Sequence, residues 1–103
     1  MAYTGSVRFA SDPVKSKRNR EKHGVSFEEA EVLFTSGVAY LDIYDEAYSE
    51  TEDRFLAIGP IDPGIIAVVY TERDGDIIRI ISARGATNTE KELYRQCVGG
   101  KLR

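Results

Sequence analysis

The spacing of apolar residues changes along the chain and thereby outlines the fold. Residues 27, 30, 33 and 34 are apolar and recur at helical spacing, whereas later runs alternate or are almost wholly apolar, as strands are. The pattern predicts strands at residues 6–9, 38–44, 54–59, 65–71 and 77–83, and helices at residues 13–22, 27–36 and 88–98. Because short turns join the later strands, the order β-α-α-β-β-β-β-α predicts one α+β domain over residues 1–103, built on an antiparallel meander.

Local capping signals mark the ends of the predicted helices. Asp12 is a preferred N-cap residue, and Pro13 fits the first helical position, where a missing N–H costs nothing. Gly24 allows the left-handed backbone that ends many helices. Residues 26–29 and 87–90 both have the Ser/Thr-x-x-Glu spacing of a capping box. These signals predict where all three helices begin.

The longest apolar run, residues 65–70, is far shorter than the roughly 20 residues that cross a bilayer. Such a run predicts a central strand that is covered on both faces. The first residues show no basic segment followed by an apolar one, so no signal peptide is expected. We therefore expect a soluble cytoplasmic protein without a membrane partner.

Charge is distributed unevenly over the chain, whose net charge is −3. Residues 1–24 carry six basic and two acidic residues, whereas residues 25–53 carry nine acidic residues and no Lys or Arg. The predicted helix at residues 13–22 is strongly basic, so we expect it at the surface, where its polarity serves solubility or a ligand. The acidic stretch would repel phosphate groups, and the basic helix would attract them.

Metal chemistry finds little support in the sequence. The chain has one His and one Cys, His23 and Cys97, and none of the ligand spacings of zinc or calcium sites. No glycine-rich loop precedes a helix to hold a nucleotide phosphate. We therefore expect no metal and no cofactor. His23 lies at a predicted helix C-terminus, where the dipole favours its protonated form, and either a capping or a proton-transfer role fits it.

Several arginines lie on the predicted strands. Arg54 begins one strand and Arg84 ends another, and we expect the two to converge at one end of the sheet. Strict alternation places Arg79 and Arg84 on opposite faces of an unbroken strand. A single strand arginine is typically part of a surface ion pair, but several beside a basic helix suit a ligand with a phosphate backbone.

Four segments of the sequence, taken in order, resemble the BrnT family of toxins. They are Phe-x-x-Asp-Pro through Lys-His-Gly-Val-Ser-Phe-Glu-Glu-Ala at residues 9–30, Arg-Phe-Leu-Ala-Ile-Gly at 54–59, Val-Tyr-Thr-Glu-Arg at 69–73, and Ile-Arg-Ile-Ile-Ser-Ala-Arg followed by Ala-Thr at 78–87. Glu90-x-x-x-Tyr94 also fits the family. The chain departs from the family at two positions. Ser11 stands where the family usually has a Trp, and Gly85 stands where the family has a second arginine directly after the one that matches Arg84.

The resemblance implies a RelE-like fold and a metal-independent ribonuclease, the toxin of a type II toxin–antitoxin pair that inhibits translation. It implies an RNA substrate, a BrnA-like antitoxin as partner, and operator DNA bound only through the antitoxin complex. The alternative is a weak or inactive homologue that serves as an antitoxin-binding module. Gly85 and Ser11 favour that alternative, whereas the retained Lys22 and Arg84 oppose it.

RNA cleavage without a metal needs a base for the 2′-hydroxyl, cations for the charged transition state and an acid for the leaving oxygen. Given the resemblance, the expected residues are, for catalysis, Lys22, His23, Arg84 and Tyr94, and, for binding RNA phosphates, Lys15, Arg54 and Arg73. Glu72 is a further candidate for proton transfer. Tyr94 has an ordinary pKa near 10, so it would need strong tuning as a base, and it could equally anchor the last helix on the sheet.

Overall fold

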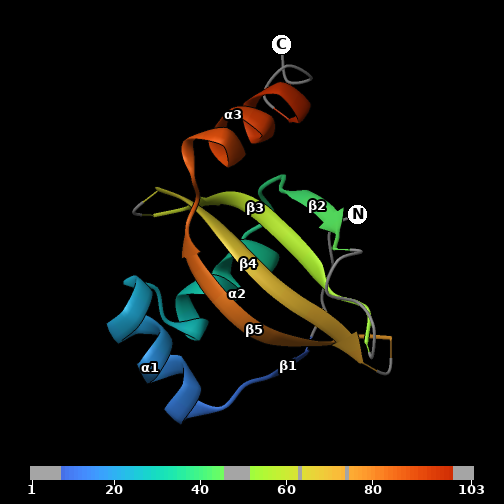
Figure 1. The fold of residues 1–103 in the computed structure, drawn as a ribbon. Coiled ribbons are helices and arrows are strands. Elements are labelled where there is room, and N and C mark those ends of the chain that lie inside the picture. Colours follow the sequence, from blue (N-terminus) through green and yellow to red (C-terminus); the bar gives the residue numbers. More distant parts are fainter. Residues whose placement is uncertain (1–7, 46–51, 63, 74, 99–103) are drawn as a thin grey trace.

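The computed structural model describes residues 8–45, 52–62, 64–73 and 75–98. The elements follow one another in the predicted order (Figure 1): β1 (Arg8–Ala10), α1 (Pro13–His23), α2 (Phe27–Thr35), β2 (Leu41–Tyr44), β3 (Phe55–Ile61), β4 (Gly64–Arg73), β5 (Ile77–Gly85) and α3 (Asn88–Cys97). The α+β class is therefore confirmed. Residues 6 and 7 of the predicted first strand, and residues 46–51 of the acidic stretch, lie outside the described residues.

The described strands form one sheet in the order β1-β5-β4-β3-β2. The last four strands make the predicted antiparallel meander. The first strand, β1, instead pairs with β5 in parallel, from Arg8 opposite Ile77 to Ala10 opposite Arg79. This pairing makes the sheet mixed. It could not be predicted from local sequence signals, because the paired residues are almost 70 positions apart.

The turn between β3 and β4 is tighter than predicted. Pro60 pairs with Ile65 and Ile61 with Gly64, so both residues extend β3 beyond the predicted turn of residues 60–64. A proline is tolerated there because the pairing of β3 with its other neighbour, β2, ends at Ile58, which leaves Pro60 at an edge with no bond to donate. The predicted strand at residues 38–44 is likewise shorter and begins at Leu41.

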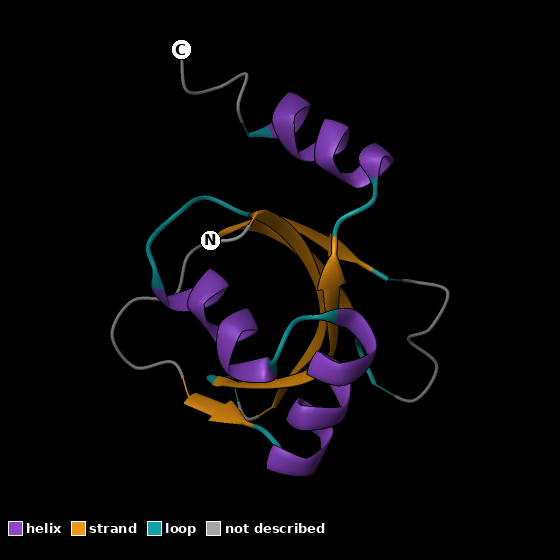
Figure 2. Ribbon diagram, turned by 90° about the vertical axis from the view of Figure 1, so that its left-hand side faces the viewer, coloured by secondary structure: helices purple, strands orange, loops and turns teal. Residues whose placement is uncertain are grey.

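The hydrophobic core lies between α2 and the concave face of the sheet (Figure 2). Phe27, Leu33 and Phe34 of α2 are each at most 2% exposed, and they pack with Val68 and Tyr70 of β4. The close approach of α2 to the sheet explains Gly59 of β3, where a Cβ would lie 2.6 Å from the Leu33 Cδ1 atom. The central position of β4 is confirmed.

A β-bulge in β5 decides which way its arginines point. Ile80 pairs with Tyr70 and Ser82 with the adjacent Val69, so Ile81 is an extra residue in the ladder. The core side of β5 therefore changes from even to odd numbers, and its members are Ile78, Ile80 and Ala83. Because Arg79 and Arg84 alternate with these core residues, both face away from the core. The prediction of opposite faces was wrong because it assumed an unbroken strand.

Candidate functional site

The basic helix α1 lies beside the edge of β5, at the end of β1 (Figure 1). It begins as predicted: the Asp12 carboxylate accepts a hydrogen bond from the Val14 N–H at 2.9 Å, and Pro13 occupies the first turn. It ends at Gly24, which has φ of 79° and whose N–H donates to the Arg20 carbonyl at 2.8 Å. These local caps hold a helix that has almost no apolar face of its own.

Two buried polar residues join α1 to the rest of the protein. Asn19, only 8% exposed, donates from its amide nitrogen to the carbonyl of Val25 at 2.6 Å and to that of Ala83 in β5 at 2.7 Å. Its amide oxygen accepts the Ala83 N–H at 3.3 Å. Ser16 accepts the Phe27 N–H at 2.9 Å and donates to the Glu28 carboxylate at 2.6 Å. Because these bonds replace apolar contacts, a polar helix can be firmly packed.

Neither Asn19 nor Ser16 was expected from the sequence to have a role. The available signal was their spacing of three residues on a helix whose other polar residues are mostly charged. An uncharged polar pair at that spacing marks the inward side of such a helix.

The face of α1 that meets β5 carries a row of cations. Lys15, Arg18, Lys22 and His23 line a groove of about 310 Å³ between the helix and Ile81 and Ser82 of β5. Within the described part of the chain, none of these four residues forms an ion pair. The structure therefore brings together three of the expected site residues, Lys15, Lys22 and His23, in a surface that suits a polyanion.

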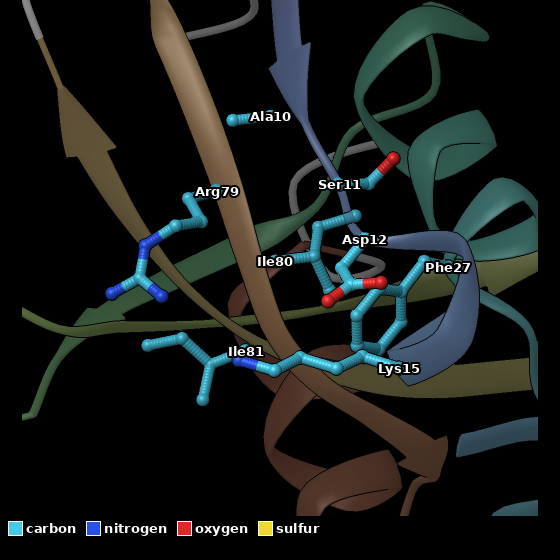
Figure 3. A pocket seen from close by; sticks show the side chains of 8 residues that line it. All are labelled: Ala10, Ser11, Asp12, Lys15, Phe27, Arg79, Ile80 and Ile81. Carbon is cyan, nitrogen blue, oxygen red and sulfur yellow. The ribbon is translucent and has the colours of Figure 1, made fainter. Parts of the chain in front are cut away.

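A pocket of about 240 Å³ adjoins this groove at the start of α1 (Figure 3). Lys15, Phe27 and Ile81 line both hollows, so the two are neighbours. In the close-up, the Asp12 carboxylate lies near the Phe27 ring and the Lys15 stem, and the Arg79 side chain extends on the other side of β5. The pocket thus combines apolar walls with one carboxylate and one ammonium group.

Arg84, a further expected catalytic residue, lies outside this groove and is engaged by α3. Its two terminal nitrogens donate to the two carboxylate oxygens of Glu90, at 2.7 and 2.9 Å. Arg84 thereby lowers the pKa of Glu90 to about 2, and the same carboxylate caps α3 by accepting the Thr87 N–H at 2.9 Å. The positive charge of Arg84 is therefore already balanced within the fold.

Tyr94 is also placed by packing. Its hydroxyl donates to the Ala39 carbonyl at 2.8 Å, and burial raises the pKa of the phenol above its ordinary value. A tyrosine in this state is a poor base at neutral pH, and its bond connects α3 to the segment before β2. Tyr94 is one of the residues that hold α3, which has no buried residue of its own.

The expected convergence of Arg54 with Arg84 is wrong. Glu52 lies between Arg54 and Arg79, with nitrogen–oxygen distances of 3.7 and 2.8 Å. In a meander, β3 and β5 run in the same direction, so the start of β3 meets the start of β5 and not its end, where Arg84 lies. Arg73 is exposed at the end of β4, and Glu72 beside it is exposed as well.

No group of three or more His, Cys, Asp or Glu side chains among the described residues could hold a metal ion. None of the described helices has the length and apolar character needed to cross a membrane.

Comparison with known proteins places this arrangement in a family. The family model described as the ribonuclease toxin BrnT of a type II toxin–antitoxin system matches residues 12–90. The crystal structure of the ribonuclease toxin BrnT from Brucella abortus has the same fold, with a TM-score of 0.57 and 23% sequence identity over 81% of this chain and 100% of that chain. No curated protein matches the chain. Because the family model spans most of the chain, the protein belongs to the BrnT family of ribonuclease toxins of type II toxin–antitoxin systems.

Proposed function

We propose that this protein is a metal-independent endoribonuclease that inhibits translation by cutting RNA in the groove between α1 and β5. The observation that carries the proposal is the row of cations, Lys15, Arg18 and Lys22, which runs along that groove to His23. Their charges have no carboxylate partner among the described residues, so they are available to RNA phosphates.

The proposed cleavage is an internal transfer at one phosphate. The 2′-oxygen attacks the phosphorus, the bond from phosphorus to the 5′-oxygen breaks, and the products are a 2′,3′-cyclic phosphate and a 5′-hydroxyl. His23 takes the proton of the 2′-hydroxyl as the general base. Lys22 stabilises the charge on the phosphorane and protonates the departing oxygen, and Lys15 holds a neighbouring phosphate.

The other expected site residues have no direct part in the proposed cleavage. They are Tyr94, which is structural, and Arg84, Arg54 and Arg73, which could contact phosphates. The Tyr94 hydroxyl is bonded to the Ala39 carbonyl, and Arg84 is held by Glu90, so neither group is offered to RNA in the unbound protein. Arg84 reaches a phosphate only by sharing its guanidinium with Glu90. Arg54 and Arg73 lie on the sheet away from the groove residues and would contact more distant phosphates.

The proposed partner is a BrnA-like antitoxin that covers the groove. Direct cover inhibits without any conformational relay, and the contacts on the antitoxin would then be acidic. Operator DNA would be bound through the antitoxin in the complex. Such a partner competes with RNA for the same cations, so one surface serves both activity and its control.

The test is cleavage of a fluorescently labelled single-stranded RNA by the purified protein, in buffer with EDTA. We expect cutting that persists in EDTA, with termini of the stated kinds in mass spectrometry. His23→Ala and Lys22→Ala should each slow cleavage about a hundredfold, in the range for loss of an acid–base group. Lys17→Ala, an exposed residue of α1 outside the groove, should leave the rate unchanged.

A specific observation favours a second function, that of an antitoxin-binding module with weak activity. The pair between Arg84 and Glu90, together with Gly85 in place of a second arginine, leaves this corner with little positive charge to offer. Unimpaired growth of cells that express the soluble protein, combined with tight antitoxin binding, would establish that second function. Growth arrest relieved by the antitoxin would establish the first, and a cleavage activity restored only by added metal would contradict the proposed mechanism.

A further inference from the structure

The pocket at the start of α1 has a composition that differs from the groove it joins. Its walls include the apolar side chains of Phe27, Ile80 and Ile81, and its polar groups include Asp12 and Lys15 (Figure 3). The groove beyond it is lined by cations alone among its charged residues. A single carboxylate has therefore been placed at the end of a surface suited to phosphates.

The Asp12 carboxylate limits what can occupy the pocket. One of its oxygens accepts the Val14 N–H, and it forms no ion pair within the described part of the chain. An ionised carboxylate only accepts hydrogen bonds, so it would repel a phosphate and favours a group that donates N–H or O–H. In an RNA chain the ribose 2′-hydroxyls and the base edges provide such donors, and only a base edge can offer two neighbouring donors to the two oxygens of one carboxylate.

The other walls favour a flat ring with acceptors as well as donors. The partly exposed Ile81 offers apolar surface above the buried Phe27 and Ile80, and the Lys15 ammonium is a donor only. Guanine matches this set, since its N1–H and N2–H groups face a carboxylate while its O6 and N7 atoms accept from a lysine. A volume of about 240 Å³ is below the range of sites for whole drug-sized ligands and suits one base.

The distance along the helix fits a base subsite beside a cleavage site. From Lys15 to Lys22 the helix rises about 10 Å, at about 1.5 Å per residue. Lys15 lines both the pocket and the groove, so one side chain contacts a base or its phosphate at the junction. A strand whose base enters the pocket therefore continues along the row of cations toward His23.

We propose that this pocket, with Asp12 as the specificity-determining residue, is a guanine-binding subsite that selects the nucleotide next to the cut. The inference rests on the proposed ribonuclease function, whose groove it extends.

Two measurements test it, one of which does not require cleavage. In the first, 15N-labelled protein is titrated with guanosine, adenosine, cytidine and uridine monophosphates and followed by NMR. We expect guanosine monophosphate to bind most tightly, with shifts at Asp12, Lys15 and Ile81. In the second, RNAs that differ at one base are cleaved, and guanine should be preferred about tenfold or more.

The decisive variant is Asp12→Asn. Asn is as good an N-cap as Asp, so α1 should keep its stability, but its amide presents a donor where guanine needs an acceptor. We expect about a tenfold loss of guanine preference in both measurements. Asp62→Asn, the same change on an exposed carboxylate in the turn between β3 and β4, is the matched control.

The outcomes separate this inference from the proposed function. Cleavage with equal rates for all four bases, unaltered by Asp12→Asn, would overturn the guanine subsite and leave the ribonuclease standing. Preferred binding of guanosine monophosphate without any cleavage would support the subsite and refute the ribonuclease. Preference for another base would also overturn the inference.

Discussion

Expected catalytic residues lie in two regions of the molecule, the groove beside α1 and the start of α3. Their positive charges are unpaired in the first region and paired in the second. Along α1, Lys15, Lys22 and His23 line an open groove and form no ion pair with any described residue. At the start of α3, Arg84 is 39% exposed but donates two hydrogen bonds to Glu90. The comparison teaches that a motif cation is available to RNA only where the fold has not already supplied its counter-charge.

The largest expected effect comes from reversing the charge of the groove. Lys15→Glu combined with Lys22→Glu should slow RNA cleavage at least a hundredfold, because two charge-assisted phosphate contacts of about 1.5–3 kcal/mol each are lost. The same variant should weaken antitoxin binding, chiefly through slower association at low salt. Cleavage rates and stopped-flow association measure the two effects.

The control for this variant has the same change in net charge at exposed residues elsewhere. Lys17→Glu combined with Arg95→Glu should alter cleavage and association only slightly. Equal losses in both double variants would show that overall charge, and not the groove, attracts the RNA.

The next effect concerns the hydrogen bonds by which Asn19 holds α1 against β5. Asn19→Asp should lower the free energy of unfolding by about 3 kcal/mol, because a carboxylate cannot donate to the Val25 and Ala83 carbonyls that it would face. Urea unfolding at pH 7 measures the change. Asn88→Asp, at the exposed start of α3, should be nearly neutral. An unaltered midpoint in Asn19→Asp would mean that α1 is held by other contacts.

RNA affinity is expected to rise if a cation is added beside Arg84, at the end of β5. Gly85→Arg should raise RNA affinity about tenfold, as one charge-assisted phosphate contact would. The substitution is sterically open because a Cβ at Gly85 meets nothing within 4 Å. Binding to an uncleavable RNA, measured over a range of salt concentrations, should show a steeper slope. If the slope and the affinity stay the same, this corner does not face the RNA.

The smallest effect concerns the pair itself. Because Arg84 holds the pKa of Glu90 at about 2, below its ordinary value of 4.5, the ionised pair stabilises the folded state above pH 4.5 and is lost as the pH falls toward 2. Glu90→Gln should therefore cost about 1 kcal/mol or less at pH 7, given solvent screening of a pair whose Arg84 side chain is 39% exposed, and nothing well below pH 2. Unfolding of both proteins at several pH values tests this, and a constant difference would contradict it.

The sequence predicted what depends on neighbouring residues and missed what depends on distant ones. The three N-caps, at Asp12, Ser26 and Thr87, are all observed because capping is decided within four residues. The bulge at Ile81 was not predicted because it depends on the register between β4 and β5. Only one side of the groove could be predicted. The positive charge of α1 is visible in the sequence, but the position of β5 as the opposite wall of the groove depends on the long-range hydrogen bonds of Asn19.

Those bonds of Asn19 have a further consequence, for self-association. β1 pairs with β5 only as far as Arg79, so the backbone of β5 beyond that point lies at a sheet edge, where another chain could add a strand. The Asn19 amide occupies both the N–H and the carbonyl of Ala83 and so imitates one residue of a missing strand. Another strand could therefore pair with β5 at Ala83 only by first displacing the Asn19 side chain.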